Sequence, residues 1–298
     1  MKTTDRIFVA GHRGLVGGAI VRRLRDAGYD NLLLRTRSEL DLTRQADVHS
    51  FFDETRPQVV FDAAARVGGI HANDTYPADF IRDNLLMQNN LIDSAFRAGT
   101  EKFVFLGSSC IYPRLATQPM SEDCLLTGPL ESTNEWYAIA KIAGIKMCQA
   151  YRRQHGFNAI SLMPTNLYGP GDNFHPENSH VLPALIRKFH EAARDGRETV
   201  TVWGTGTPRR EFLHVDDLAD AAVYMAENYD GEDIVNIGVG DDISIADLAA
   251  LVSDTVGFKG GIVFDTDKPD GTPRKLLDVS RATSIGWRAR TSLEDGVR

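Results

Sequence analysis

Short apolar runs alternate with longer amphipathic segments over the first 170 residues of the chain. The apolar runs occupy residues 6–10, 31–34, 59–63, 102–106 and 159–163. Runs of this length predict buried strands. The amphipathic segments occupy residues 19–27, 84–98 and 137–155, and each is followed directly by a glycine, as helices commonly are. Strands that alternate with helices in this way predict an α/β fold of Rossmann type, a doubly wound parallel sheet with helices on both faces.

Beyond residue 170 the pattern is less regular. A polar loop at residues 169–176 precedes a predicted helix at residues 180–193, and a last helix is predicted within residues 291–298. Between them, short strands are predicted at residues 200–203, 210–215, 235–237 and 262–265. We therefore expect a Rossmann domain over residues 1–170, to which strands and helices near residues 210–240 return. Residues 171–298 are expected to form a smaller, mixed α/β lobe.

A glycine-rich loop lies between the first predicted strand and helix. It reads G-x-x-G-x-x-G and consists of Gly11, His12, Arg13, Gly14, Leu15, Val16 and Gly17. Glycines at a strand-to-helix turn allow the backbone to approach a pyrophosphate at the helix N-terminus. The loop therefore predicts a dinucleotide site, and a purely structural glycine turn is the alternative.

The residues after the second strand indicate which dinucleotide binds. NAD enzymes place an acidic residue there for the ribose hydroxyl, but this chain has Arg35 and Arg37. Arginines favour a 2′-phosphate, and Arg13 could join them, which predicts NADP(H). Solvated surface arginines are the alternative. Asp41 and Leu42 are expected against the adenine, although Asp41 could instead be a helix N-cap.

Three residues form a predicted catalytic group. Tyr137 and Lys141 are four residues apart, so both side chains lie on one helix face. From there the Lys141 ammonium can lower the pKa of the Tyr137 phenol and make it a proton donor or acceptor. Ser108 follows a buried strand, where ligands gather in open α/β sheets, and could orient a substrate oxygen. The alternative for Ser108 is a turn serine that binds its own backbone.

Cys110 and His180 add a second candidate proton-transfer pair. A simple carbonyl reductase would not need them, so the chain is expected to move both protons and a hydride. The alternatives are that Cys110 is a small buried apolar residue and that His180 only starts a helix. His214 is expected to have a structural role, and His175 is a weak candidate. A metal site is not expected, because no Cys/His cluster with ligand spacing occurs.

Composition and charge exclude several functional classes. The formal net charge is −8, whereas nucleic-acid and membrane-surface proteins need a basic face. No apolar run approaches the ~20 residues of a membrane span. The three cysteines are Cys110, Cys124 and Cys148, an odd number at spacings that suit neither zinc nor a disulfide framework. We therefore expect a cytoplasmic protein without nucleic-acid or membrane partners.

Seven segments resemble one family of enzymes. They are GHRGLVG at residues 11–17, GSSCIYP at 107–113, NEWYAIAK at 134–141, PTNLYG at 164–169, DNFHPENSH at 172–180, REFLHVDD at 210–217 and KPDGTPRKLLD at 268–278. Together they resemble the GDP-L-fucose synthases, which are 3,5-epimerase-4-reductases of the extended short-chain dehydrogenase/reductase family. The similarity extends from the first strand to about Trp287.

The resemblance implies a two-stage reaction on GDP-4-keto-6-deoxy-mannose. Cys110 and His180 would act as base and acid in epimerisation at C3 and C5. NADPH would then reduce C4 while Tyr137 donates a proton, Lys141 tunes it and Ser108 holds the oxygen. Other residues implied at the cofactor are Ala64, Leu106, Gly107, Pro164, Thr165, Asn166, Leu167 and His180. Those implied at the sugar nucleotide are Ser109, Asn166, Lys188, Trp203, Arg210, Asp270 and Lys275, the last four at its GDP end, although each of these four is also compatible with plain surface packing.

The resemblance leaves related functions open. A GDP-colitose synthase would use the same pocket, a plain reductase would not need Cys110 and His180, and a non-catalytic NADPH-binding protein would usually lose the tyrosine or lysine. It also implies a homodimer through a four-helix bundle. Apolar residues that could form this interface are Leu85, Leu86, Leu91, Ile92, Ile142, Ile145 and Met147. The alternative is that these side chains pack on their own sheet.

Overall fold

The computed structural model describes residues 1–176, 179–268 and 270–298. The first five strands and the strand that later joins them are β1 (Ile7–Ala10), β2 (Leu32–Leu33), β3 (Val59–Asp62), β4 (Lys102–Leu106), β5 (Ala159–Pro164) and β10 (Val235–Ile237). The remaining strands are β6 (Asn166–Tyr168), β7 (Thr199–Trp203), β8 (Arg209–Arg210), β9 (Phe212–His214), β11 (Ile243–Ser244), β12 (Gly261–Asp265) and β13 (Arg274–Lys275).

The helices of the first half are α1 (Leu15–Asp26), α2 (Gln45–Thr55), α3 (Ile70–Thr75), α4 (Pro77–Ala98) and α5 (Glu135–His155). Those of the second half are α6 (Val181–Asp195), α7 (Val215–Asn228), α8 (Ile245–Val256), α9 (Ser280–Ile285) and α10 (Leu293–Val297). Two short 3-10 helices, η1 (Ser109–Ile111) and η2 (Glu122–Cys124), follow β4. Among the described residues, no helix is both long enough and apolar enough to cross a membrane.

The main sheet has six parallel strands in the order β2-β1-β3-β4-β5-β10. The chain runs from β1 to β2 on one side and then crosses to β3 on the other, so the strand order reverses between β1 and β3. In open α/β sheets, ligands bind outside the carboxyl ends of the strands at this reversal. The strand order therefore predicts a ligand site at the residues that follow β1 and β3.

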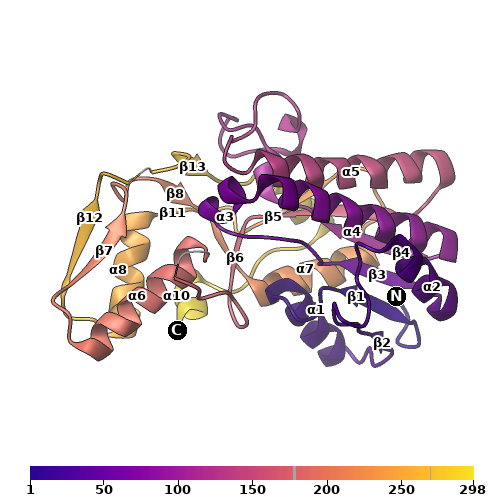
Figure 1. Ribbon diagram of the computed structural model, residues 1–298, viewed down its shortest axis with the longest axis horizontal. Helices are drawn as coiled ribbons and strands as arrows, with labels where there is room; N and C mark the ends of the chain where they lie inside the picture. Colours follow the sequence, from indigo (N-terminus) through magenta and orange to yellow (C-terminus); the bar gives the residue numbers. More distant parts are fainter. Residues whose placement is uncertain (177–178, 269) are drawn as a thin grey trace.

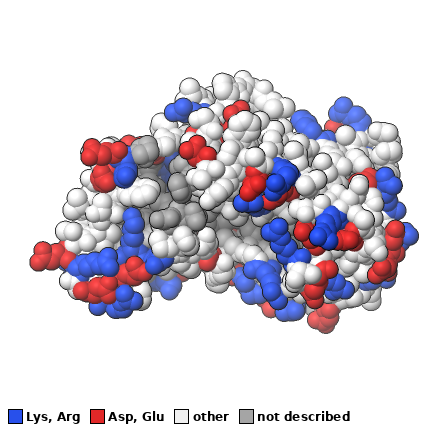
Figure 2. Space-filling view, viewed as in Figure 1, with Lys and Arg blue, Asp and Glu red and all other residues white. Residues whose placement is uncertain are grey.

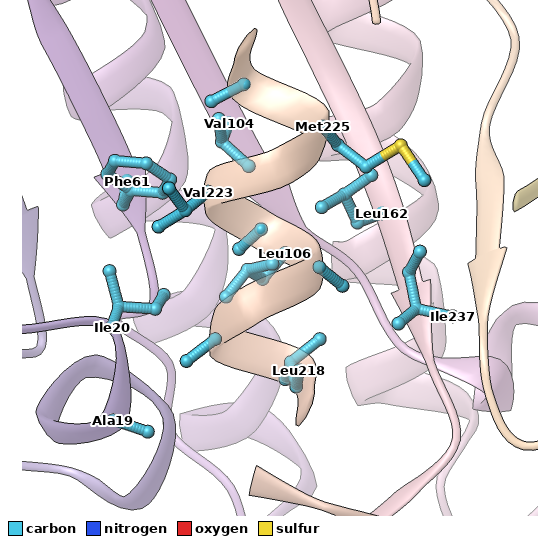
Figure 3. Packing of buried hydrophobic residues seen from close by; sticks show 14 of the residues in the cluster. Ala19, Ile20, Phe61, Val104, Leu106, Leu162, Leu218, Val223, Met225 and Ile237 are labelled. Atoms are coloured by element: carbon cyan, nitrogen blue, oxygen red, sulfur yellow. The ribbon is translucent and has the colours of Figure 1, made fainter. Parts of the chain in front are cut away.

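Alternate residues of each strand support opposite faces of the sheet, as the two-residue repeat of a strand requires. Side chains such as Phe61, Val104 and Leu106 pack against α1 and α7, whose core residues Figure 3 shows at close range. The intervening side chains, such as Val60 and Phe105, pack with α2, α4 and α5 on the other face. This places α4 and α5 side by side over one face (Figure 1).

A second group of elements lies at one end of the molecule (Figure 1). It contains α6 and α8, the three-stranded sheet β11-β8-β13 and the two-stranded sheet β12-β7. The group has its own apolar core, in which Leu185 and Phe189 of α6 pack with Leu248 and Val252 of α8. Two-stranded pairing of β6 with β9 connects the end of the main sheet to this group.

The predicted parallel α/β fold is confirmed, with differences in detail. The predicted strand at residues 210–215 is wrong, because Glu211 interrupts it and separates β8 from β9. Both oxygens of the Glu211 carboxylate accept backbone N–H groups, from Val239 and Gly240 at one oxygen and from Leu277 at the other. This side chain is fully buried. On either side of it, β8 pairs with β11 and β9 pairs with β6, so the two short strands belong to different sheets.

The surface matches the mixed charge of the sequence. On the face drawn in Figure 2, acidic and basic side chains are interspersed over both ends of the molecule. Nucleic-acid-binding proteins instead gather Lys and Arg on one face. Figure 2 shows side chains of both signs over the same elements, and the absence of a nucleic-acid partner stays a prediction.

Candidate active site

The glycine loop forms a narrow cradle between the ends of β1 and β3. Gly11 has a φ of +77°, and a Cβ there would lie 2.7 Å from the carbonyl oxygen of Ala63 and 2.9 Å from the Cα of Ala64. A Cβ on Gly17 would overlap the carbonyl oxygen of Gly11. Gly14 is the N-cap of α1, so the unpaired N–H groups of that helix face the loop. The cradle therefore fits the pyrophosphate of a dinucleotide.

His12 adds an unpaired polar atom to this cradle. Its Nδ1 is buried and has no hydrogen-bond partner among the described residues. Burial and the neighbouring Arg13 lower the pKa of the imidazole, so at neutral pH it is uncharged. Leu15 and Val16 of the same loop are half-buried and pack against the apolar core under α1.

Three predicted cofactor arginines are exposed, Arg13 in the glycine loop and Arg35 and Arg37 in the loop after β2. Hydrogen bonds from Thr36 lower the pKa of the Glu39 carboxyl, and Arg35 and Arg13 lower it further. Both guanidinium groups therefore lie within electrostatic range of one carboxylate. Arg37 acts in the same way on Asp41. Arginines that converge from two loops are suited to a 2′-phosphate.

Asp41 holds a local turn and is not a helix N-cap. Its Oδ1 accepts hydrogen bonds from the backbone N–H of Thr43 at 3.0 Å and from the Thr43 hydroxyl at 2.7 Å. The N-cap of α2 is Arg44, so the N-cap alternative is wrong. Contact of Asp41 and Leu42 with an adenine stays a prediction.

Ser108 connects the two predicted proton-transfer groups. It follows Leu106 and Gly107 at the end of β4, and its hydroxyl oxygen accepts the backbone N–H of Cys110 at 3.4 Å. The same hydroxyl lies close enough to the Tyr137 phenol and the Cys110 thiol to act on the pKa of both groups, lowering each. Cys110 and Ser109 are buried in η1, next to this hydroxyl. Tyr137, Ser108 and Cys110 therefore form one contiguous polar group.

The structure changes the expected role of Lys141. Its ammonium donates a 2.7 Å hydrogen bond to the carbonyl oxygen of Leu106 and lies 5.8 Å from the centre of the Tyr137 ring. Burial, with Cys110 and Asp62 nearby, raises the pKa of the Tyr137 phenol, although the Ser108 hydroxyl opposes this. The phenol is therefore held in its protonated form, contrary to the expectation that its pKa is lowered.

Cys110 and His180 share a positive neighbour. Burial raises the pKa of the Cys110 thiol, and the largest opposing effect comes from Lys275. Desolvation by the surrounding protein atoms lowers the pKa of the His180 imidazole, and the charge of the same Lys275 lowers it further. We expected Lys275 at the nucleotide end of the pocket, but in the structure its charge also acts on both epimerisation candidates.

The residues predicted for the GDP end lie together on the second group of elements. The ammonium groups of Lys188 and Lys268 lie 5.4 Å and 5.5 Å from the centre of the Trp203 ring, which is 63% exposed. Asp270 accepts hydrogen bonds from the Thr205 backbone and hydroxyl, two residues beyond Trp203. Arg210 lies beside Lys275 in the β8–β13 register.

The end of β5 forms the junction between the two groups of elements. Pro164 and Leu167 belong to β5 and β6, and Thr165 lies between these strands. The Asn166 amide donates to the carbonyl oxygen of Glu211 at 2.7 Å, and the Thr165 hydroxyl donates to the same oxygen at 3.3 Å. Asn166 and Thr165 are therefore both hydrogen-bonded to Glu211, the residue between β8 and β9.

Sequence reasoning missed Asp62, Glu211 and Lys268. A carboxylate that ends the apolar strand β3 was a visible signal for Asp62, whereas nothing local indicates the burial of Glu211. Of the motif residues, positions 177, 178 and 269 lie outside the described part of the chain. Within the described ranges, no three His, Cys, Asp or Glu side chains gather as a metal site would require.

Comparison with known proteins agrees with this geometry. Residues 7–238 match the NAD dependent epimerase/dehydratase family. GDP-L-fucose synthase 1 from Arabidopsis thaliana is 65% identical over 292 residues, which cover 98% of this chain and 90% of the relative. GDP-L-fucose synthase from Escherichia coli is 54% identical, with 98% and 94% covered. The solved structure of MlghC, a GDP-mannoheptose C4 reductase from Campylobacter jejuni with NADP bound, has a TM-score of 0.93, 42% identity and coverage of 100% of this chain and 97% of that one. The chain therefore belongs to the NAD dependent epimerase/dehydratase family and, within it, to the GDP-L-fucose synthases.

Proposed function

We propose that this chain converts GDP-4-keto-6-deoxy-mannose to GDP-L-fucose by epimerisation at C3 and C5 and NADPH-dependent reduction at C4. The observation that carries the proposal is the position of Ser108, which accepts the backbone N–H of Cys110 and acts on both the Tyr137 phenol and the Cys110 thiol. A proton donor for reduction and a thiol for epimerisation thereby lie on either side of one hydroxyl. The identities of 54–65% to GDP-L-fucose synthases support the same reaction.

The cradle at Gly11, Gly14 and Gly17 supports NADP(H) as the cofactor. Their lack of side chains leaves room for a diphosphate, and Arg13, Arg35 and Arg37 suit the 2′-phosphate. When bound there, NADPH supplies the hydride for C4. Ala64 lies against Gly11, and Leu106 and Gly107 precede Ser108, so the predicted cofactor contacts fall along one edge of the sheet.

Epimerisation is assigned to Cys110 and His180. The 4-keto group acidifies the protons on C3 and C5, so a base on one side and an acid on the other can invert each centre. Lys275 favours the thiolate of Cys110, because a nearby positive charge lowers the pKa of a thiol. General acid–base groups contribute about 10²- to 10⁴-fold each, so loss of either group should be easily measured.

Reduction is assigned to Tyr137, Lys141 and Ser108. Because burial keeps the Tyr137 phenol protonated, a proton is available for the oxygen at C4 when the carbonyl is reduced. Ser108 can hold that oxygen, since its hydroxyl already contacts the phenol. Lys141 is placed to stabilise the phenolate that remains after proton donation.

The GDP moiety is assigned to the second group of elements. The exposed Trp203 ring offers a stacking surface for the base, and Lys188 and Arg210 offer positive charge for the diphosphate. Asp270 shapes the turn beside Trp203. We therefore also propose that residues 1–170, with later returns, bind cofactor and that residues 171–298 mainly bind substrate.

The test compares wild-type protein with Cys110→Ser on GDP-4-keto-6-deoxy-mannose. NADPH absorbance reports reduction, and NMR identifies the product. Wild-type protein should yield GDP-L-fucose, whereas Cys110→Ser should reduce the ketone slowly without inversion. Cys124→Ser is the matched control and should behave as wild type, because Cys124 lies in η2, away from this pocket. Unchanged epimerisation by Cys110→Ser would contradict the assignment. Oxidation of NADPH only with a 3,6-dideoxy-4-keto substrate would instead favour a GDP-colitose synthase.

Assembly and location form a separate proposal. Of the seven predicted interface residues, Leu91, Ile92, Ile142 and Ile145 are buried in the core of this chain, so their assignment to an interface is corrected. Leu86, another of the seven, is exposed, and with Trp136 and Ile139 it belongs to the apolar surface of α4 and α5, where each of the three is 37–42% exposed. A homodimer that pairs these helices would cover them, and Ile139→Glu should yield monomers by light scattering.

The free thiol of Cys110 suits the reducing cytoplasm.

A further inference from the structure

Asp62 is a buried carboxylate at the end of an otherwise apolar strand. Only 1% of the residue is exposed, and its Oδ1 accepts the backbone N–H of Ala64 at 3.2 Å. Its Oδ2 is buried and has no hydrogen-bond partner among the described residues. Buried carboxylates are costly unless another group compensates the charge. The surroundings of Asp62 should therefore contain such a group.

Lys141 belongs to α5, which covers the face of the sheet to which Asp62 points. It lies next to β4, the strand that neighbours β3. Asp62 is paired in register with Phe105 of β4, and both side chains point toward α4 and α5. The Lys141 ammonium lies 4.9 Å from the centre of the Phe105 ring. Gly144 allows this close approach of α5, because a Cβ there would overlap the Phe105 ring. The carboxylate and the ammonium therefore share one buried space beneath Tyr137.

The two charges stabilise each other. Burial lowers the pKa of Lys141, which is only 3% exposed, and Asp62 is the strongest opposing influence. Burial raises the pKa of Asp62 to about 6, and Lys141 is the strongest influence that opposes this rise. At neutral pH, Asp62 is therefore mostly ionised beside a lysine whose charged form burial disfavours.

Other groups around the pair do not replace this charge. Helix α5 also contributes Tyr137 and Cys148, and η1 contributes Cys110. Burial raises the pKa of all three, so in each case the surroundings disfavour the negative form that could replace the Asp62 carboxylate. The flanking strands contribute the apolar residues Ala10 and Phe105, and α4 contributes the uncharged Gln88, which lies against Gly144.

We infer that Asp62 is a positioning residue for the reduction step, whose buried carboxylate keeps Lys141 in its charged form beneath Tyr137. This rests on the proposed function, in which Tyr137 gives its proton to the oxygen at C4. The resulting phenolate needs a positive neighbour, and Lys141 provides it only while protonated. Asp62 thus acts through Lys141 and does not touch the substrate.

The test measures single-turnover reduction by Asp62→Asn between pH 6 and 10. Loss of the carboxylate lowers the pKa of Lys141, so the decline of the rate at high pH should move down by at least one pH unit. A shift of one unit makes reduction about tenfold slower on that limb. KM for the sugar nucleotide should change less than threefold. Because Lys141 also acts on the Cys110 thiol, the Cys110-dependent exchange of the C3 and C5 protons with deuterated water is compared at pH 6, where Lys141 is expected to stay charged, and there it should change less than threefold.

Asp217→Asn is the matched control. Asp217 is also a buried carboxylate, but it accepts backbone N–H groups of Arg290 and Thr291 on the other side of the sheet. This variant should keep the wild-type pH profile even if it is less stable. An unshifted profile in Asp62→Asn, or an equal loss of reduction, KM and exchange, would overturn the inference.

A second readout does not depend on turnover. NMR titration of ¹³C-labelled lysine side chains, with Lys141 assigned from the spectrum of Lys141→Arg, measures the pKa of Lys141 directly. Asp62→Asn should lower it by at least one unit, and an unchanged value would overturn the inference even if the enzyme reduces no 4-keto sugar. Failure of wild-type protein to oxidise NADPH, with a normal Lys141 titration shift, would reject only the proposed function.

Discussion

Replacing Asp62 with asparagine removes a buried charge while nearly preserving the shape of the side chain. The amide oxygen can still accept the N–H of Ala64, so the local turn after β3 should persist. The substitution therefore isolates the electrostatic contribution of the carboxylate to the free energy of unfolding.

The magnitude follows from the pKa of Asp62. Folding raises this pKa from an ordinary value of 3.8 to about 6. At 1.36 kcal/mol per pKa unit, the difference corresponds to about 3 kcal/mol. Because the folded pKa is the higher one, the folded state binds the proton more tightly. Ionised Asp62 therefore destabilises the folded state. This destabilisation is absent below about pH 4, grows as the pH rises through 6, and is complete above about pH 7.

The assay is urea unfolding of wild-type protein and Asp62→Asn at several values between pH 4.5 and 8. The stability of the variant relative to wild type should rise with pH by about 2–3 kcal/mol, since part of the change occurs below pH 4.5. The variant would then be more stable at pH 8 and yet slower in reduction. A stability difference that does not vary with pH would refute the reasoning.

Three further substitutions test other parts of the structure. Gly17→Ala places a Cβ against the Gly11 carbonyl oxygen, so NADPH affinity by fluorescence titration should fall more than tenfold, and unchanged affinity would reject the cradle. Glu211→Gln replaces one acceptor oxygen with an NH₂ group facing a backbone N–H, which should cost about 2 kcal/mol in urea unfolding. A cost near zero would contradict its role as a junction. Trp203→Ala should raise KM for the sugar nucleotide about 5- to 100-fold with kcat nearly constant, as loss of base stacking requires, and a fall in kcat alone would refute it.

Periodicity and turn chemistry predicted the strands of the main sheet and helices α1, α4, α5, α6 and α10, but not the bounds of α2, α3, α7, α8 and α9. The strands at residues 102–106 and 235–237 have the predicted bounds, and α4 and α5 end where the closing glycines placed them, although α4 begins at Pro77, seven residues before its predicted start. Helix α6 lies within two residues of its predicted bounds. The glycine loop was also recognisable, because its three glycines serve a local strand-to-helix turn. Such features depend on neighbours within a few residues, so a local pattern is sufficient to predict them.

Tertiary structure decided the charge states and the composition of the site. Lys275 and Cys110 are 165 positions apart in sequence, and only the pairing of β8 with β13 beside the main sheet lets one act on the other. The pKa of Tyr137 is not lowered as the spacing of Tyr137 and Lys141 along the helix led us to expect, because burial and the nearby Asp62 raise it. Burial also decided which apolar residues of α4 and α5 stay at the surface. The sequence by itself therefore determined the fold type and the candidate groups, whereas their protonation and partners depend on long-range packing, since desolvation and Coulomb interactions are set by whatever surrounds a group in space.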